Sequence, residues 1–135
     1  MLPNQHIMII DDDPINNFLS KLAIRETFPD TQVIEHENAV DALQMLNKNK
    51  NDASQLPWLI LLDLNMPVME GWMFLEEFSE IKNDLIATPK IFVLSASDYS
   101  EDIAKAEKSE VVTCYIIKPL TASKLKELST SLNVK

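Results

Sequence analysis

Short apolar segments alternate with segments of helical spacing along the whole chain. Five apolar segments have the length of β-strands, and they cover residues 7–10, 33–34, 58–62, 91–94 and 115–117. Their apolar runs are nearly continuous, which is typical of strands in a parallel sheet that is covered on both faces. We therefore expect a buried sheet and not a sheet with one face in water.

Between these segments, apolar residues recur at the spacing of an amphipathic helix. The first stretch follows the pattern most closely, and the fourth is the weakest. The residues that carry the pattern are Ile15, Phe18, Leu19 and Leu22; Ala39, Leu43 and Leu46; Phe74, Phe78 and Ile81; Ile103, Ala104 and Ala106; and Leu125, Leu128 and Leu132. Strand and helix thus alternate five times, which supplies the crossover connections that a parallel sheet needs. The pattern predicts an α/β fold with a five-stranded sheet, in a single domain over residues 1–135 with no internal repeat or linker.

Composition and charge narrow the possible partners. The formal net charge is −9, which argues against nucleic acid or an anionic membrane surface as a partner, because both attract basic proteins. The first residues lack a basic region followed by an apolar stretch, so we see no secretory signal. The longest strongly apolar run, residues 58–62, is far too short to span a membrane. We expect a soluble cytoplasmic protein, in which the single cysteine, Cys114, is a buried structural thiol.

Polar residues follow directly after several predicted strands. Ligands of an open parallel sheet bind at the carboxyl ends of its strands, so these residues are considered together. They are Asp11, Asp12 and Asp13 after the first strand, Asp63 and Asn65 at the third, Ser95 at the fourth, and Lys118 at the fifth. None of these positions is specific by itself, but together they place acids, a hydroxyl and a lysine on one edge of the sheet.

The three consecutive aspartates have different expected roles. Pro14 suits the first position of a helix, which makes Asp13 the N-cap. Asp11, Asp12 and Asp63 remain as a cluster that needs a counter-charge, and Mg²⁺ suits a few carboxylates with room for water and phosphate. A calcium-binding loop is excluded, because it would need glycine at Asn16 and glutamate at Leu22. A glycine-rich phosphate loop is also excluded, since the chain has a single glycine.

With these residues in place, the chain resembles the response-regulator receiver domain of two-component signalling over almost its whole length. IIDDDP resembles the acidic pair of the family, and LLDLNMPVMEG its phosphoacceptor segment. VLSAS and YIIKPL resemble the hydroxyl-bearing and lysine-proline ends of the fourth and fifth strands. The resemblance implies a flavodoxin-like doubly wound fold, with strand order 2-1-3-4-5 and helices on both faces. It also implies a cis peptide bond before Pro119.

The resemblance further implies a role for each residue of the site. Asp63 accepts a phosphoryl group from a sensor histidine kinase or a histidine phosphotransfer protein. Asp12, Asp63 and the backbone carbonyl of Asn65 bind Mg²⁺, and Asp11 assists through water. Ser95 and Lys118 contact the phosphoryl oxygens, and Ser95 with Tyr115 forms the switch that changes a protein-binding surface. The chain departs from the family by carrying serine at position 95, where many members have threonine, which keeps the hydroxyl.

Several alternatives remain open from the sequence. A receiver domain cut from a hybrid kinase or a longer regulator competes with the stand-alone response regulator that we expect. A non-phosphorylated adaptor with the same fold is a second class. A true enzyme, an aspartate-dependent phosphatase, is a third, but that chemistry needs an aspartate where this chain has Asn65. The partner kinase, the downstream target and the oligomeric state are not determined by the sequence.

Overall fold

The computed structural model describes residues 6–64, 71–96 and 100–131, and its strands and helices alternate as the sequence predicts. Helix α1 begins after the N-cap residue Asp13, and α2 begins after the N-cap residue Asn38. The strands form from the predicted apolar segments. The elements are β1 (His6–Ile10), α1 (Pro14–Thr27), β2 (Gln32–His36), α2 (Ala39–Lys48), β3 (Leu59–Asp63), α3 (Gly71–Ile81), a 3₁₀ turn η1 (Lys82–Asp84), β4 (Lys90–Ser95), α4 (Ser100–Lys108), β5 (Cys114–Ile117) and α5 (Ala122–Ser131).

The five strands form one parallel sheet in the order β2-β1-β3-β4-β5. The register pairs Ile10 of β1 with Leu62 of β3, and Ser95 of β4 with Ile117 of β5. The carboxyl ends of these strands therefore lie at one edge of the sheet. The predicted fold class and strand order are confirmed.

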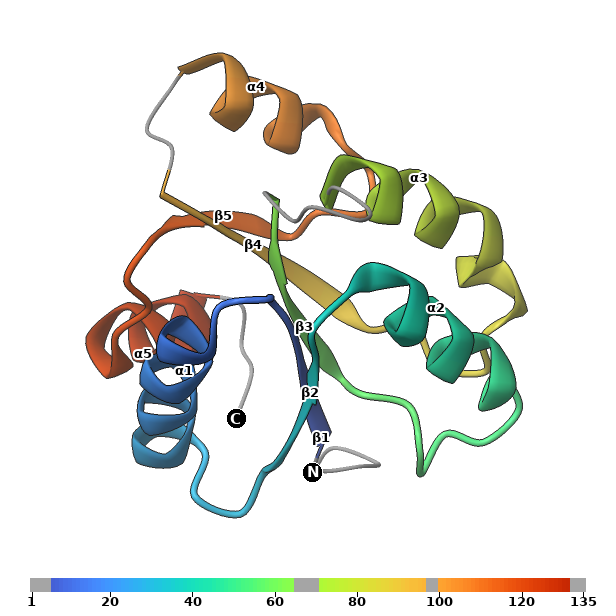
Figure 1. Cartoon of the computed structure of the whole chain (residues 1–135), viewed down its shortest axis with the longest axis horizontal. Helices are drawn as coiled ribbons and strands as arrows, with labels where there is room; N and C mark the ends of the chain where they lie inside the picture. Colours follow the sequence, from blue (N-terminus) through green and yellow to red (C-terminus); the bar gives the residue numbers. More distant parts are fainter. Residues whose placement is uncertain (1–5, 65–70, 97–99, 132–135) are drawn as a thin grey trace.

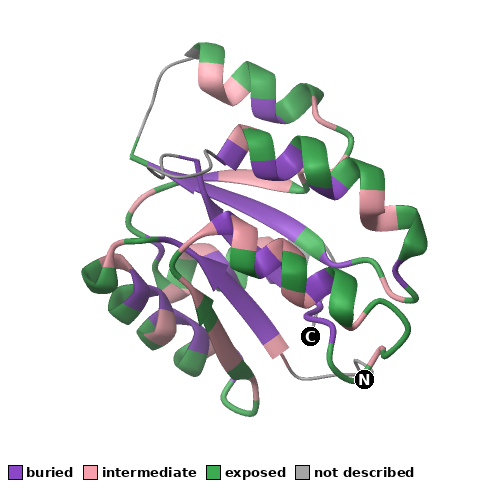
Figure 2. Cartoon of the chain, turned by 45° about the vertical axis from the view of Figure 1, so that its right-hand side comes forward, coloured by how far each residue is buried: buried purple, intermediate pink, exposed green. Residues whose placement is uncertain are grey.

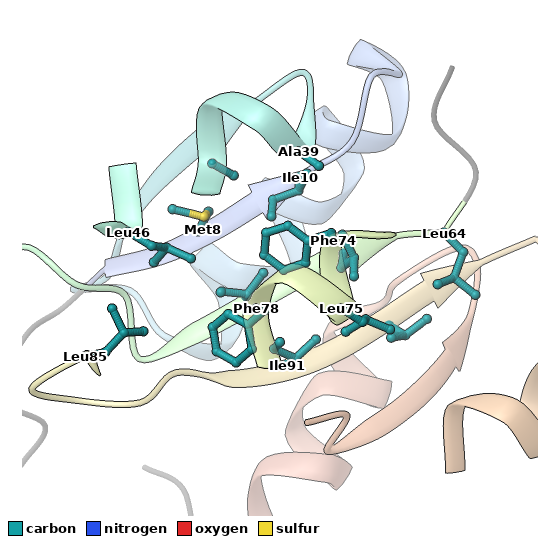
Figure 3. Packing of buried hydrophobic residues seen from close by; sticks show 14 of the residues in the cluster. Met8, Ile10, Ala39, Leu46, Leu64, Phe74, Leu75, Phe78, Leu85 and Ile91 are labelled. Carbon is teal, nitrogen blue, oxygen red and sulfur yellow. The ribbon is translucent and has the colours of Figure 1, made fainter. Parts of the chain in front are cut away.

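Helices cover both faces of the sheet, with α1 and α5 on one side and α2 and α3 on the other (Figure 1). Because successive strand residues point to opposite faces, Met8 and Ile10 pack toward α2 and α3 while Ile7 and Ile9 pack toward α1 and α5. Figure 3 shows the core on the side of α2 and α3, where the rings of Phe74 and Phe78 of α3 stack with their centres 5.9 Å apart. No helix of the described residues is long and apolar enough to cross a membrane.

The apolar stripe that predicts α1 is not the face that α1 buries. Ile15, Phe18, Leu19 and Leu22 are 69%, 61%, 39% and 44% exposed, whereas Asn17, Ser20, Ala23 and Ile24 face the protein. The outer surface of the helices is mostly exposed in Figure 2. Full burial of a large apolar side chain is worth roughly 1.5–3 kcal/mol, so α1 forgoes this stabilisation at several positions. The helix prediction is confirmed, but its period does not reveal which face packs inward.

Three further expectations concern α4, Cys114 and α5. The weak apolar pattern of α4 matches a helix in which Ala106 is buried, and Lys105 of α4 lies 4.3 Å from the ring centre of Trp72 in α3. Cys114 is only half-buried, but burial still raises the pKa of its thiol to about 12, so the thiol stays protonated at neutral pH. Leu132, expected in the last helix, lies outside the described residues.

Gly71 is required by a close approach between the start of α3 and the end of β3. Its N–H donates to the carbonyl of Leu64 at 2.9 Å. A Cβ at this position would lie 2.6 Å from the Cα of Leu64 and 2.8 Å from the carbonyl oxygen of Asp63. Because both neighbours are backbone atoms, they cannot move aside at low cost. The single glycine of the chain thus holds the backbone next to Asp63.

The substitution Gly71→Ala is expected to destabilise the fold by about 1–3 kcal/mol, because the added methyl group forces the backbone at Asp63 and Leu64 to move. Urea unfolding followed by circular dichroism measures the change. The control is Glu77→Ala, an exposed position on the same helix, where we expect a change of no more than about 0.5 kcal/mol. Equal stability of Gly71→Ala and Glu77→Ala would contradict the steric argument.

Candidate functional site

Three carboxylates meet at the carboxyl end of the central strands. Asp11 follows β1 and Asp63 ends β3, and the two strands are neighbours in register. One carboxylate oxygen from each of Asp11, Asp12 and Asp63 lies within 4.8 Å of the other two. Asp11 and Asp63 are 2% and 5% exposed, while Asp12 is exposed. The structure thus brings together the three acids that the sequence predicts, with one of them open to solvent.

Lys118 reaches this cluster from the carboxyl end of β5, two strands away from β3. Its Nζ lies 3.1 Å from Oδ2 of Asp11 and 3.4 Å from Oδ1 of Asp63. The lysine follows β5, which is separated from β3 by β4, and the peptide bond between Lys118 and Pro119 is cis, as expected. The ammonium group therefore contacts two of the three acids directly.

The acid cluster suits a divalent cation. Three carboxylates and one ammonium group together carry a net charge of −2. A single divalent ion neutralises this charge, and hard cations such as Mg²⁺ prefer carboxylate and carbonyl oxygens. The exposed position of Asp12 keeps one side of the cluster open to water and to an incoming ligand. Asn65, whose carbonyl is a predicted ligand, lies outside the described residues.

The third aspartate, Asp13, caps α1 as predicted. Its Oδ1 accepts a hydrogen bond from the backbone N–H of Ile15 at 2.9 Å, and Pro14 occupies the first turn. The side chain of Asn16 donates to its other oxygen at 3.0 Å. Asp13 also helps to place the cluster, because its N–H donates to Oδ1 of Asp11 at 2.9 Å.

Ser95 lies on β4, the strand next to β3, and Tyr115 lies on β5, the strand beyond it. Ser95 ends β4 and is fully buried, and its carbonyl accepts from the N–H of Lys118 at 2.8 Å. Tyr115 pairs with Val93 in the sheet and is half-buried against the core formed with α2 and α3. The chain between Ser95 and α4 includes residues 97–99, which lie outside the described residues.

Two residues that sequence reasoning did not single out hold the site in place. Asn17 is buried, and its Nδ2 donates to the carbonyl of Asp11 at 3.1 Å. The sequence carried no signal for this role, because the apolar period of α1 indicates the opposite face as the buried one. Lys124 donates to the carbonyls of Ile117 and Pro119 at 2.9 and 3.0 Å, which secures the turn that carries Lys118. No local pattern distinguishes Lys124 from a surface lysine.

Comparison with known proteins gives a consistent result. Residues 7–130 match the family model of the response regulator receiver domain. The chemotaxis protein CheY-3 of Vibrio cholerae is 32% identical over 125 residues, which cover 92% of this chain and 88% of that protein. The transcriptional regulatory protein GlrR of Escherichia coli is 27% identical over 85% of this chain, but the match spans only 23% of GlrR.

A solved structure supports the same relationship. The crystal structure of a two-component response regulator from Cytophaga hutchinsonii has a TM-score of 0.82 and 33% identity, and the match covers 98% of this chain and 99% of that chain. The family match and the shared topology, together with the acid cluster and Lys118 at the strand ends, lead to one conclusion. This chain belongs to the response regulator receiver domain family of two-component signalling.

Proposed function

We propose that this receiver domain accepts a phosphoryl group on Asp63 and uses it to change a protein-binding surface. Receiver domains as a family are signalling domains that receive phosphoryl groups from histidine kinases. The observation that carries the proposal is the position of Asp63. Asp63 is the last residue of the central strand β3 and is buried. Its carboxylate lies close to two further acids and to the ammonium group of Lys118.

The chemistry is a transfer of the phosphoryl group from a phosphohistidine to a carboxylate oxygen of Asp63. The new oxygen–phosphorus bond forms as the phosphorus–nitrogen bond of the donor breaks, and the electron pair of that bond stays on the imidazole. Catalysis of such transfers rests on positioning and on charge stabilisation more than on covalent assistance. Lys118 supplies one positive charge next to Asp63, and the hydroxyl of Ser95 is the expected contact of a phosphoryl oxygen.

A divalent cation completes this arrangement. Asp12 and Asp63 are the proposed direct ligands, with the carbonyl of Asn65, and Asp11 acts through water and its contact with Lys118. When bound, Mg²⁺ neutralises the charge that develops on the phosphoryl oxygens. The net charge of −2 that the protein leaves in the cluster is the support for this assignment.

The phosphoryl donor is proposed to be a sensor histidine kinase or a histidine phosphotransfer protein. The signal is proposed to leave through Ser95 and Tyr115, because their strands are neighbours in the sheet and connect the site to α4 and α5. When the hydroxyl of Ser95 moves to the phosphoryl group, the ring of Tyr115 moves into the space that it leaves. If phosphorylation stabilises one of the two conformations over the other by a few kcal/mol of free energy, the equilibrium between them shifts.

Asp63 is expected to be the only residue that becomes phosphorylated. Incubation with acetyl phosphate and Mg²⁺ should add one phosphoryl group, measured by the intact mass of the protein. The variant Asp63→Asn should add none, while its circular dichroism spectrum stays that of the folded protein. A stable phosphoryl group on Asp11, Asp12 or Ser95 of the unmodified protein would contradict the assignment of Asp63 as the phosphorylated residue.

Asp12 and Asp13 are expected to have different functions, metal binding and helix capping respectively. Asp12→Ala is expected to weaken Mg²⁺ binding in calorimetry by about tenfold or more, since it removes a direct ligand. Asp13→Ala should retain Mg²⁺ binding and lose about 1 kcal/mol of stability, because it removes the cap of α1. Unchanged Mg²⁺ affinity in Asp12→Ala would refute this division.

The ring of Tyr115 is expected to change its surroundings when Asp63 is loaded. The chain has two tyrosines, so the variant Tyr99→Phe leaves Tyr115 as the single tyrosine signal. Its NMR ring resonances should shift when beryllium fluoride, a phosphoryl mimic, is added with Mg²⁺. In Ser95→Ala the shift should be reduced, because the hydroxyl that couples the two sites is absent. Ring resonances that stay in place in the loaded protein would show that the signal takes another route.

A further inference from the structure

Helix α4 is attached to the rest of the protein by few buried side chains. Among residues 101–108, Ala106 alone is buried, and its methyl group removes little apolar surface from water. The helix lies beside α3 at the top of both Figure 1 and Figure 2. Contacts with α3 therefore matter more for the position of α4 than they would for a well-buried helix.

One of these contacts joins Lys105 of α4 to Trp72 of α3. The ammonium nitrogen of Lys105 lies 4.3 Å from the centre of the Trp72 ring. A lysine ammonium within about 6 Å of an indole ring is attracted by the negative face of that ring. Trp72 is half-buried and packs against the core on the side of α2 and α3, whereas Lys105 is exposed. The contact thus ties an exposed helix to a ring that the core holds in place.

The space next to this contact is not filled by side chains. A hollow of about 290 Å³ lies between α3 and the end of α4, and both Trp72 and Lys105 line it. Leu75 of α3 and Val111, in the connection to β5, line it as well. Protein interiors are otherwise close-packed, and close packing resists displacement. The hollow therefore leaves α4 room to move relative to α3 when Lys105 leaves the ring.

Lys105 contacts the ring although acidic partners are close by. Glu101 lies four residues earlier on α4, at the spacing that allows a glutamate and a lysine to pair on a helix. Glu76 of α3 and Glu110 line the same hollow as Lys105. Among the described residues, Lys105 nevertheless forms no ion pair with an acid. Its place on Trp72 is therefore not a general result of the negative charge of the protein.

Trp72 is also tied to the end of β3, where Asp63 lies. It follows Gly71, whose N–H donates to the carbonyl of Leu64 at 2.9 Å. A Cβ on Gly71 would lie 2.8 Å from the carbonyl oxygen of Asp63, so the two backbone segments are in direct contact. A shift of the backbone at Asp63 therefore moves the first turn of α3. Because Trp72 belongs to that turn, its ring moves with it.

We propose that Lys105 and Trp72 are positioning residues that hold α4 against α3, and that they connect Asp63 to α4 by a route separate from Ser95 and Tyr115. The route runs through the backbone contact at the start of α3 and then through the ring of Trp72. The holding of α4 is independent of the proposed function. The connection rests on that function, because it needs a change at Asp63 to transmit.

Hydrogen exchange of the α4 backbone amides tests the contact itself. Lys105→Met keeps the apolar stem and removes the charge, so α4 should open more often and its amides should exchange about 2- to 5-fold faster. Lys105→Arg should keep the rates of the unmodified protein, because a guanidinium group also stacks on an aromatic ring. The control Lys108→Met makes the same change at an exposed position of the same helix and should leave the rates unchanged.

Two results of this experiment would overturn the proposal. Unchanged exchange in Lys105→Met would show that the apolar stem of the side chain is sufficient and that the charge does not hold α4. Equally faster exchange in Lys105→Met and Lys108→Met would show a general effect of charge on the helix.

A double-mutant cycle tests whether Lys105 acts through the ring. Trp72→Leu removes the ring and keeps an apolar side chain against the core. In the Trp72→Leu background, Lys105→Met should change the exchange rates of α4 by less than about 1.5-fold, because the contact is already absent. If Lys105→Met has its full effect there, Lys105 acts through another group and the pair is wrong.

Loading of Asp63 tests the connection to α4. Beryllium fluoride and Mg²⁺ are added to the ¹⁵N-labelled protein, and the indole N–H of Trp72 and the backbone amides of α4 should shift. Of the two indole signals of the chain, that of Trp72 is the one missing in Trp72→Leu. In Lys105→Met the shifts of α4 should be at least about twofold smaller, while the ring of Tyr115 responds as before. Lys108→Met should respond like the unmodified protein.

The outcomes separate this connection from the proposed function. If amides next to Asp63 shift and those of Trp72 and α4 do not, the connection is overturned and the phosphoacceptor role stands. If α4 shifts equally with and without Lys105→Met, the signal reaches α4 by another route and the connection is again overturned. If no signal of the unmodified protein responds, the phosphoacceptor role and the connection are both overturned, while hydrogen exchange still decides whether Lys105 and Trp72 hold α4.

Discussion

The mutual repulsion of three carboxylates is the constraint on which this structure depends. Two like charges about 4 Å apart repel by roughly 4 kcal/mol at the effective dielectric of a protein surface. The parallel register of β1 and β3 nevertheless places Asp11 and Asp63 side by side, with Asp12 next to them. Lys118 contacts two of the acids, but it offsets only part of their charge. The remaining negative charge makes this edge of the sheet suited to a cation and to the proposed phosphoryl transfer, so the repulsion that lowers stability also defines the candidate site.

Several neighbouring contacts keep these charges in a fixed arrangement. Asn17 holds the carbonyl of Asp11, Lys124 holds the turn that carries Lys118, and the absence of a side chain at Gly71 lets α3 start directly against the end of β3. None of these residues belongs to the acid cluster. Their effect is to remove backbone freedom from the loops of the sheet edge, where the groups would otherwise separate to reduce their repulsion. Preorganisation of this kind is what electrostatic stabilisation of a transferred group requires.

The two faces of α1 differ in how they are packed. The inner face packs through Ile24 and several small or polar residues, and the outer face leaves Ile15 and Phe18 in water. A helix built only for stability would bury its largest apolar residues, so this arrangement gives up stabilisation that the sequence could supply. The exposed stripe begins at Ile15, three residues after Asp12 in the sequence. The same helix thus holds the carbonyl of Asp11 from its inner face and leaves an apolar outer face in water.

The sequence by itself determined the alternation of strands and helices, the positions of the strand ends and the cap at Asp13. These features depend on local periodicity and on backbone groups within a few residues, which a chain carries without any knowledge of its neighbours. It also determined that Asp11, Asp12, Asp63 and Lys118 lie on one edge, because parallel strands bring their carboxyl ends together. Only the tertiary structure decided that α1 turns its apolar stripe outward, that Lys118 contacts Asp11 as well as Asp63, and that Gly71 lies against the backbone of Asp63. The physical reason is that a helical period shows that one side differs from the other, whereas the choice of the buried side depends on what α5 and the sheet present to it.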